Sequence, residues 1–268
     1  YFLCKHWSIQ LAYMKTLINW LLFIGVVTVN ALASILPING YNTGQISAFY
    51  PNYFVPAGFT FSIWGLIYLF LLCYSITHTY FSFKQKEFPV IKKYLDQITP
   101  WYWATSVLNI SWILAWHYLQ IFTSVVVMIA FLMVLIQIFI YTRNLSNDIQ
   151  MIHRIFIIAP FTIYIGWISV ATVANISALL VNLQWNAWGI APENWAVLMI
   201  AIAIILAFCF SFFYDSIAAP LVIAWALWGI MHGEGGRIEL VYILSLIGMC
   251  IILILSLRLL IVKYILVR

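Results

Sequence analysis

Long apolar segments alternate with short polar connections along the whole chain. A helix needs about 20 apolar residues to cross the hydrocarbon core of a bilayer, and eight segments come close to that length. The segments are residues 16–36, 58–80, 100–119, 121–142, 155–182, 195–213, 216–232 and 239–262. The pattern therefore predicts an all-α fold, a polytopic transmembrane helical bundle with about eight spans.

The connections between these segments differ in character. Residues 81–99 are basic and polar, which is typical of a solvated connector, and Pro100 suits the first position of the next helix. Residues 37–57 carry no charge and are rich in turn formers and aromatic residues, so we expect them to cover the bundle as a lid. Residues 183–194 hold two tryptophans and are expected on the same side of the membrane as residues 37–57. The two aromatic connections together indicate the mouth of a site, although an interfacial aromatic belt would explain the same residues.

The composition excludes several classes of protein. The chain is 66% hydrophobic and 7% charged, with a mean hydropathy of +1.06, whereas soluble domains are about 45–50% apolar and about 25% charged. A water-soluble enzyme and a disordered chain are excluded, because neither can carry so much apolar surface. The net charge of +5 needs no nucleic acid to explain it.

The positive charges predict an orientation. With the N-terminus inside, eleven of the twelve lysines and arginines fall in inner segments, and Arg237 is the exception. The eleven are Lys5, Lys15, Lys84, Lys86, Lys92, Lys93, Arg143, Arg154, Arg258, Lys263 and Arg268. Since inner loops collect positive charge, we expect both termini inside, in a bacterial inner (plasma) membrane.

Three segments carry aromatic and amide residues at helical spacing. The stripes are Phe61, Trp64 and Tyr68; Asn109, Trp112 and Trp116; and Tyr164, Trp167, Ala171 and Asn175. Residues three, four or seven apart share one face of a helix, and amides in hydrocarbon need partners, so these faces point into the bundle. They would form an aromatic cavity for a flat, mostly apolar ligand. Core packing, with asparagine joining the helices, is the alternative.

Motifs for most kinds of chemistry are missing from the sequence. No aspartate or glutamate lies in the middle of a span, and the histidines and cysteines lack the spacing of a metal site. A glycine-rich phosphate loop and a nucleophile elbow are also missing. The sequence thus predicts no catalytic residue, no metal ligand and no cofactor, which disfavours an enzyme.

The aromatic stripes resemble those of the TspO/MBR family, the tryptophan-rich sensory or translocator proteins. In the fifth segment, Tyr164, Trp167, Ala171 and Asn175 match the family pattern Y-x-x-W-x-x-x-A-x-x-x-N at every position. Leu108, Asn109 and Trp112 match the pattern of the third helix. In the second, Pro56, Trp64 and Tyr68 match, and Phe59-Thr60-Phe61 stands for W-x-F.

The resemblance implies a five-helix bundle over residues 16–182, with a ligand pocket beneath the first loop. Residues 1–15 would be an N-terminal extension, and residues 183–268 would add further transmembrane helices. The resemblance also implies binding of a tetrapyrrole such as protoporphyrin or of a sterol-like lipid, and a homodimer. The implied lining residues are Phe59, Phe61, Trp64, Tyr68, Asn109, Trp112, Trp116, Tyr164, Trp167, Ala171 and Asn175, of which Trp116 and Tyr164 are added from helical geometry.

Three functions follow from these expectations. The first is an integral membrane ligand-binding protein, a sensor or carrier, whose partners are the hydrophobic ligand and membrane lipids. The second is a transporter or permease for a small hydrophobic substrate, in which residues 195–262 extend the bundle into a path. The third is a membrane enzyme that acts on a bound tetrapyrrole, and the missing acid–base pair counts against it.

Overall fold

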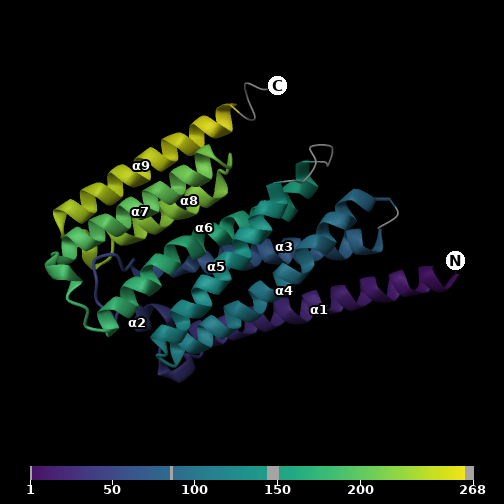
Figure 1. Ribbon diagram of the computed structural model, residues 1–268, viewed down its shortest axis with the longest axis horizontal. Helices are drawn as coiled ribbons and strands as arrows, with labels where there is room; N and C mark the ends of the chain where they lie inside the picture. Colours follow the sequence, from purple (N-terminus) through teal and green to yellow (C-terminus); the bar gives the residue numbers. More distant parts are fainter. Residues whose placement is uncertain (1, 85–86, 144–150, 263–268) are drawn as a thin grey trace.

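The computed structural model describes residues 2–84, 87–143 and 151–262 of the protein (Figure 1). This part of the chain is helical and contains no strand. The α-helices are α1 (Phe2–Ile35), α2 (Thr43–Ser47), α3 (Ile63–Phe83), α4 (Pro89–His117), α5 (Ile121–Arg143), α6 (Met151–Asn182), α7 (Pro192–Phe212), α8 (Ala218–Met231) and α9 (Glu239–Ile261). The all-α prediction is confirmed. Lys86, Lys263 and Arg268, which entered the predicted orientation, lie outside the described residues.

Six of the described helices are long and apolar enough to cross a membrane, namely α1, α3, α5, α6, α7 and α9. About eight spans were expected, and the two predicted spans that are not among these six correspond to α4 and α8. The 14 residues of α8 span about 21 Å at 1.5 Å per residue, less than the hydrocarbon thickness of about 30 Å. α4 is long enough but contains many polar and aromatic residues. The protein is thus an integral membrane protein with several spans.

The start of α4 differs from the prediction. α4 begins at Pro89, and Pro100 lies inside the helix. Pro89 already fills the first turn, where a missing N–H group costs little. The polar residues that follow suit a helix surface, since Lys92 and Asp96, four residues apart, form an ion pair. The connector predicted over residues 81–99 was therefore too long.

Five helices form a ring, in the order α1, α3, α6, α5 and α4, with α4 packed back against α1. α8 packs against the outside of α6, and α7 and α9 pack against α8 and each other. Figure 1 shows α7, α8 and α9 together on one side of the other helices. α6 therefore lies at the centre of the fold, between the ring and the three C-terminal helices.

The surfaces of these helices divide by chemistry. Large apolar side chains such as Leu21 and Ile254 are exposed on the outer helices α1 and α9, as contact with lipid requires. Buried hydroxyl groups of Ser75 and Ser169 donate to the backbone carbonyl groups four residues earlier, which satisfies them without a partner helix. Buried amide side chains lie where helices of the ring meet. Asn30 of α1, for example, donates to the Val26 carbonyl four residues earlier and also to Asn109 of α4.

Candidate functional site

The aromatic residues of the three predicted stripes meet inside the ring. Trp64 of α3 is the central residue. Its ring centroid lies 5.8 Å from Tyr68, 6.1 Å from Trp112, 5.9 Å from Tyr164 and 6.2 Å from Trp167. The faces predicted for α3, α4 and α6 therefore do point toward one another.

A cavity of about 50 Å³ lies within this cluster. Its predicted wall residues are Phe61, Trp64, Trp112, Trp116, Trp167, Ala171 and Asn175. Further wall residues, which were not predicted from the sequence, are Thr43, Ser47, Phe54, Pro56, Val170, Ala174, Ala226 and Ile230. The missed residues come from the loop over the cavity, from a neighbouring face of α6 and from α8. Uncharged loop residues were expected as a lid, but no pattern in the sequence singles out the residues of α8.

Four predicted lining residues lie elsewhere. Phe59 is 42% exposed and packs against Trp225 and Trp228 of α8, with ring centroids 5.8 and 5.0 Å away. Tyr68, Asn109 and Tyr164 lie behind the walls, and do not line the cavity. Phe59 belongs to a short 3₁₀ helix before α3, so the face-sharing of an α-helix does not extend to it.

The two predicted amides join helices. Asn109 Nδ2 donates to Tyr164 Oη at 2.8 Å, and Asn109 Oδ1 accepts from Asn30 Nδ2 of α1 at 2.6 Å. Asn175 Oδ1 accepts from Trp112 Nε1 at 2.9 Å, and Asn175 Nδ2 donates to Ser124 Oγ of α5 at 2.9 Å. Asn109 is thus structural, and Asn175 fixes a tryptophan of the cavity wall. In the sequence, the signal that could have identified Asn30 as a residue joining helices is its amide side chain within the first apolar segment.

Replacement of Asn175 by leucine should lower the free energy of unfolding by about 1 kcal/mol, because it leaves Trp112 Nε1 without its partner and removes the bond between α6 and Ser124 of α5. If Asn175 acts through Trp112, then Asn175→Leu should cost less in a Trp112→Phe background. Thermal unfolding of the four proteins in detergent measures both effects. Asn182→Leu is the control, since Asn182 is exposed at the end of the same helix. Full additivity of the two changes would contradict the pairing.

A family model described as TSPO-like protein matches residues 16–258. The chain belongs to this TSPO-like family. The resemblance inferred from the aromatic motifs is thereby confirmed. The match takes in α7, α8 and most of α9, whereas the motifs lie within residues 16–182; the division of the chain at residues 15 and 182 stays a prediction. Searches of curated proteins and of solved structures found no match.

In this TSPO-like chain, the loop of residues 37–57 closes the cavity at one end. Trp116 Nε1 donates to the backbone carbonyl of Thr43 at 3.3 Å, and Thr43 Oγ1 lies 3.1 Å from His117 Nε2. Phe54 is 2% exposed and forms part of the wall. The loop is therefore bonded to the end of α4 and contributes its own side chains to the cavity.

α8 and the turn after it hold the other part of this loop and the start of the segment that follows it. The Ala57 N–H group donates to the carbonyl of Gly229 at 2.9 Å. Gly235 lies so close to the carbonyl oxygen of Tyr53 that an added Cβ would collide with it. Trp225 Nε1 donates to the carbonyl of Thr60 at 2.9 Å. The C-terminal helices of the TSPO-like fold thus position the loop that covers the cavity.

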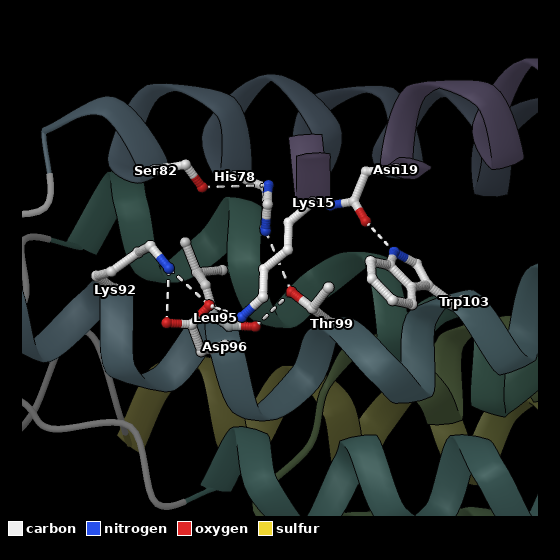
Figure 2. Close-up of polar contacts among 9 residues, drawn as sticks. All are labelled: Lys15, Asn19, His78, Ser82, Lys92, Leu95, Asp96, Thr99 and Trp103. Atoms are coloured by element: carbon white, nitrogen blue, oxygen red, sulfur yellow. Dashed lines mark hydrogen bonds and ion pairs between the residues drawn. The ribbon is translucent and has the colours of Figure 1, made fainter. Parts of the chain in front are cut away.

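A second group of polar side chains joins α1, α3 and α4 away from the cavity (Figure 2). The Asp96 carboxylate accepts from Lys15 Nζ at 2.7 Å and from Lys92 Nζ at 2.6 Å. His78 Nε2 lies 3.1 Å from Thr99 Oγ1, and the Thr99 hydroxyl donates to the Leu95 carbonyl. Trp103 Nε1 donates to Asn19 Oδ1. None of these residues belongs to the predicted aromatic stripes, and the contacts show that they tie three helices together.

The two lysines change the acidity of Asp96. Partial burial raises the pKa of Asp96, but hydrogen bonds and charge from Lys15 and Lys92 outweigh burial and hold that pKa below its usual value. A carboxylate with a lowered pKa in the folded protein stabilises the fold above its unfolded-state pKa of about 4. That contribution is lost as the pH falls through the lower, folded-state value.

Asp96→Asn should therefore destabilise the protein at pH 7 by about 1 kcal/mol, a figure kept small because the carboxylate is partly exposed to screening. The difference from the unmodified protein should shrink as the pH falls below about 4. Thermal unfolding at a series of pH values measures it. Glu234→Gln is the control. Glu234 forms an ion pair with Arg237, and both side chains are largely exposed. A difference that persists unchanged at low pH would contradict the ion-pair explanation.

Among the described residues, no group of three or more His, Cys, Asp or Glu side chains could hold a metal ion. The walls of the cavity of this TSPO-like protein offer aromatic faces and a few hydrogen-bonding groups. Among these hydrogen-bonding groups, Trp167 Nε1 stands out, because it is buried and has no hydrogen-bond partner among the described residues.

Proposed function

We propose that this TSPO-like protein is an integral membrane ligand-binding protein, a sensor or carrier. Its ligand would be a flat hydrophobic molecule such as a tetrapyrrole or a sterol-like lipid. The observation that carries the proposal is a wall of four tryptophans, Trp64, Trp112, Trp116 and Trp167, around one cavity. Aromatic faces of this kind suit a flat apolar ligand.

Trp167 provides a polar contact for such a ligand. The side chain lines the cavity and is 3% exposed, and its N–H group has no partner among the described residues. Two other indole groups of the wall are already paired, Trp112 with Asn175 and Trp116 with Thr43. A buried donor without a partner is costly, so a ligand with a carbonyl or carboxylate oxygen at this point would be favoured.

The size of the cavity sets a condition on binding. Pockets for small molecules usually measure about 300–1,000 Å³, whereas this cavity measures about 50 Å³. A ligand of the proposed class therefore requires part of the wall to move outward. The walls from residues 37–57 are the natural part to move, because most of that loop lies outside regular helices.

Tryptophan fluorescence tests the proposal directly. Titration of the purified protein with protoporphyrin IX in detergent should give saturable quenching. Trp167→Phe keeps an aromatic ring but removes the N–H donor, so it should weaken binding about tenfold. Trp188→Phe is the matched control, since Trp188 is 75% exposed and is not part of the wall of this cavity. No saturable quenching, or equal binding by all three proteins, would refute the proposal.

We also propose the orientation expected from the charges, with both termini inside, in a bacterial inner membrane. The cavity and its loop would then face outward, and the Lys15, Lys92 and Asp96 group would lie at the inner surface. Labelling of cysteines introduced at Phe49, 45% exposed, and at Lys84, 43% exposed, tests this in intact cells. A membrane-impermeant reagent should modify the first position and spare the second.

A further inference from the structure

A second cavity, of about 190 Å³, lies beside the loop that covers the first. Its walls come from loop residues 51–54, from the last turns of α6 and from the start of α7. Trp185 and Trp195 form one side, with ring centroids 5.0 Å apart. Trp195 Nε1 donates to the Ala187 carbonyl at 3.1 Å, which fixes the indole. This cavity is aromatic like the first, and it contains residues that no family motif includes.

The two cavities share one wall residue. Phe54 lines both of them and is 2% exposed. On α6, Ala174 lines the inner cavity and Ser177 lines the outer one, and residues three apart share a helix face. The cavities therefore follow one another along the same face of α6, and Phe54 belongs to the wall of both.

Hydrogen bonds hold the backbone of Phe54, whereas its ring is held by apolar packing in the buried core. Asn52 Oδ1 accepts from the Phe54 N–H group at 3.1 Å, and Asn52 Nδ2 donates to the Tyr50 carbonyl at 2.9 Å. These bonds fix the turn that carries Phe54. The side chain has cavity space on two sides, so rotation about its own bonds would open the partition without unfolding the loop.

We propose that the outer cavity is a second subsite for the flat apolar ligand, and that the ligand passes Phe54 to reach the inner cavity. This inference rests on the proposed function. Its chemical basis is the continuity of aromatic and small apolar walls on both sides of Phe54. The ligand would then enter the inner cavity from the larger outer one by displacing Phe54, while the walls from residues 37–57 move outward to make room.

Stopped-flow quenching of tryptophan fluorescence by protoporphyrin IX tests the route. Met199 lines the outer cavity and not the inner one, so Met199→Trp should obstruct the outer subsite alone. An obstruction on the path slows entry and exit by the same factor. We expect both rate constants to fall about tenfold while the dissociation constant stays within about threefold. Met133→Trp is the matched control, because Met133 is 62% exposed on α5.

Phe54→Ala provides the opposite change. It removes the partition, and we expect entry and exit to become faster, again by about tenfold, a result that a misfolded protein could not give. Saturable binding with unchanged rates in Met199→Trp and Phe54→Ala would overturn the outer subsite and leave the proposed function standing. An unmodified protein without saturable quenching would overturn both.

Discussion

Replacement of Trp64 by alanine should lower the free energy of unfolding by about 3 kcal/mol. The side chain contacts four other rings, from α3, α4 and α6. Truncation of a large aromatic residue in a packed cluster removes these contacts and leaves a void that helices cannot easily fill. Thermal or denaturant unfolding of the purified protein in detergent measures the loss, and protoporphyrin IX quenching should weaken in parallel.

The control for Trp64→Ala is the same change at an exposed tryptophan. Trp188 is 75% exposed, and its ring contacts involve Trp185 and Trp195 outside the ring of helices. Trp188→Ala should change the free energy of unfolding by less than about 1 kcal/mol. Similar losses for the two variants would show that Trp64 does not hold the cluster together.

The part of the site that lies on long helices was predictable from the sequence. Trp64, Trp112 and Trp167 were expected on inward faces, because helical periodicity fixes which residues share a face. The structure places all three on the wall of one cavity. Periodicity says nothing of contacts between elements distant in sequence, so the walls from the loop and from α8 were missed.

Phe59 and the two amides show two limits of predicting side-chain contacts from the sequence. Phe59 precedes α3 in a 3₁₀ turn, and its direction is set by Trp225 and Trp228, more than 150 residues later in the chain. Spacing alone allowed Asn109 and Asn175 either to bind a ligand or to join helices. The choice depends on partners such as Asn30 and Ser124, which lie on other segments and carry no motif.

The packing of the C-terminal helices could not be predicted from the sequence either. α8 is apolar on nearly every side, so no stripe marks the face that meets α6. The contact is close because Gly166 of α6 lies against the backbone of Ala219, where an added Cβ would be 2.7 Å from the carbonyl oxygen. Small residues allow such approach in membranes. α8 is thereby close enough to supply Ala226 and Ile230 to the cavity wall.

Replacement of Gly166 by leucine should therefore force α8 away from α6 and lower the free energy of unfolding by about 3 kcal/mol. The cost arises against backbone atoms, which cannot move as a side-chain end can. Leucine is a better helix former than glycine, so helix propensity alone would raise the stability. A loss of stability would therefore come from the packing against α8. Unfolding in detergent measures the stability. Quenching by protoporphyrin IX should also weaken, because two wall residues move with α8.

Gly65→Leu is the matched control for Gly166→Leu. Gly65 lies in α3 beside Trp64, and an added Cβ there meets nothing within 4 Å. That substitution should leave stability unchanged or raise it by up to about 1 kcal/mol through helix propensity. Equal effects of the two substitutions would mean that α8 does not rest on Gly166. A loss confined to Gly166→Leu would make the C-terminal helices part of the binding unit, since the cavity would depend on where α8 lies.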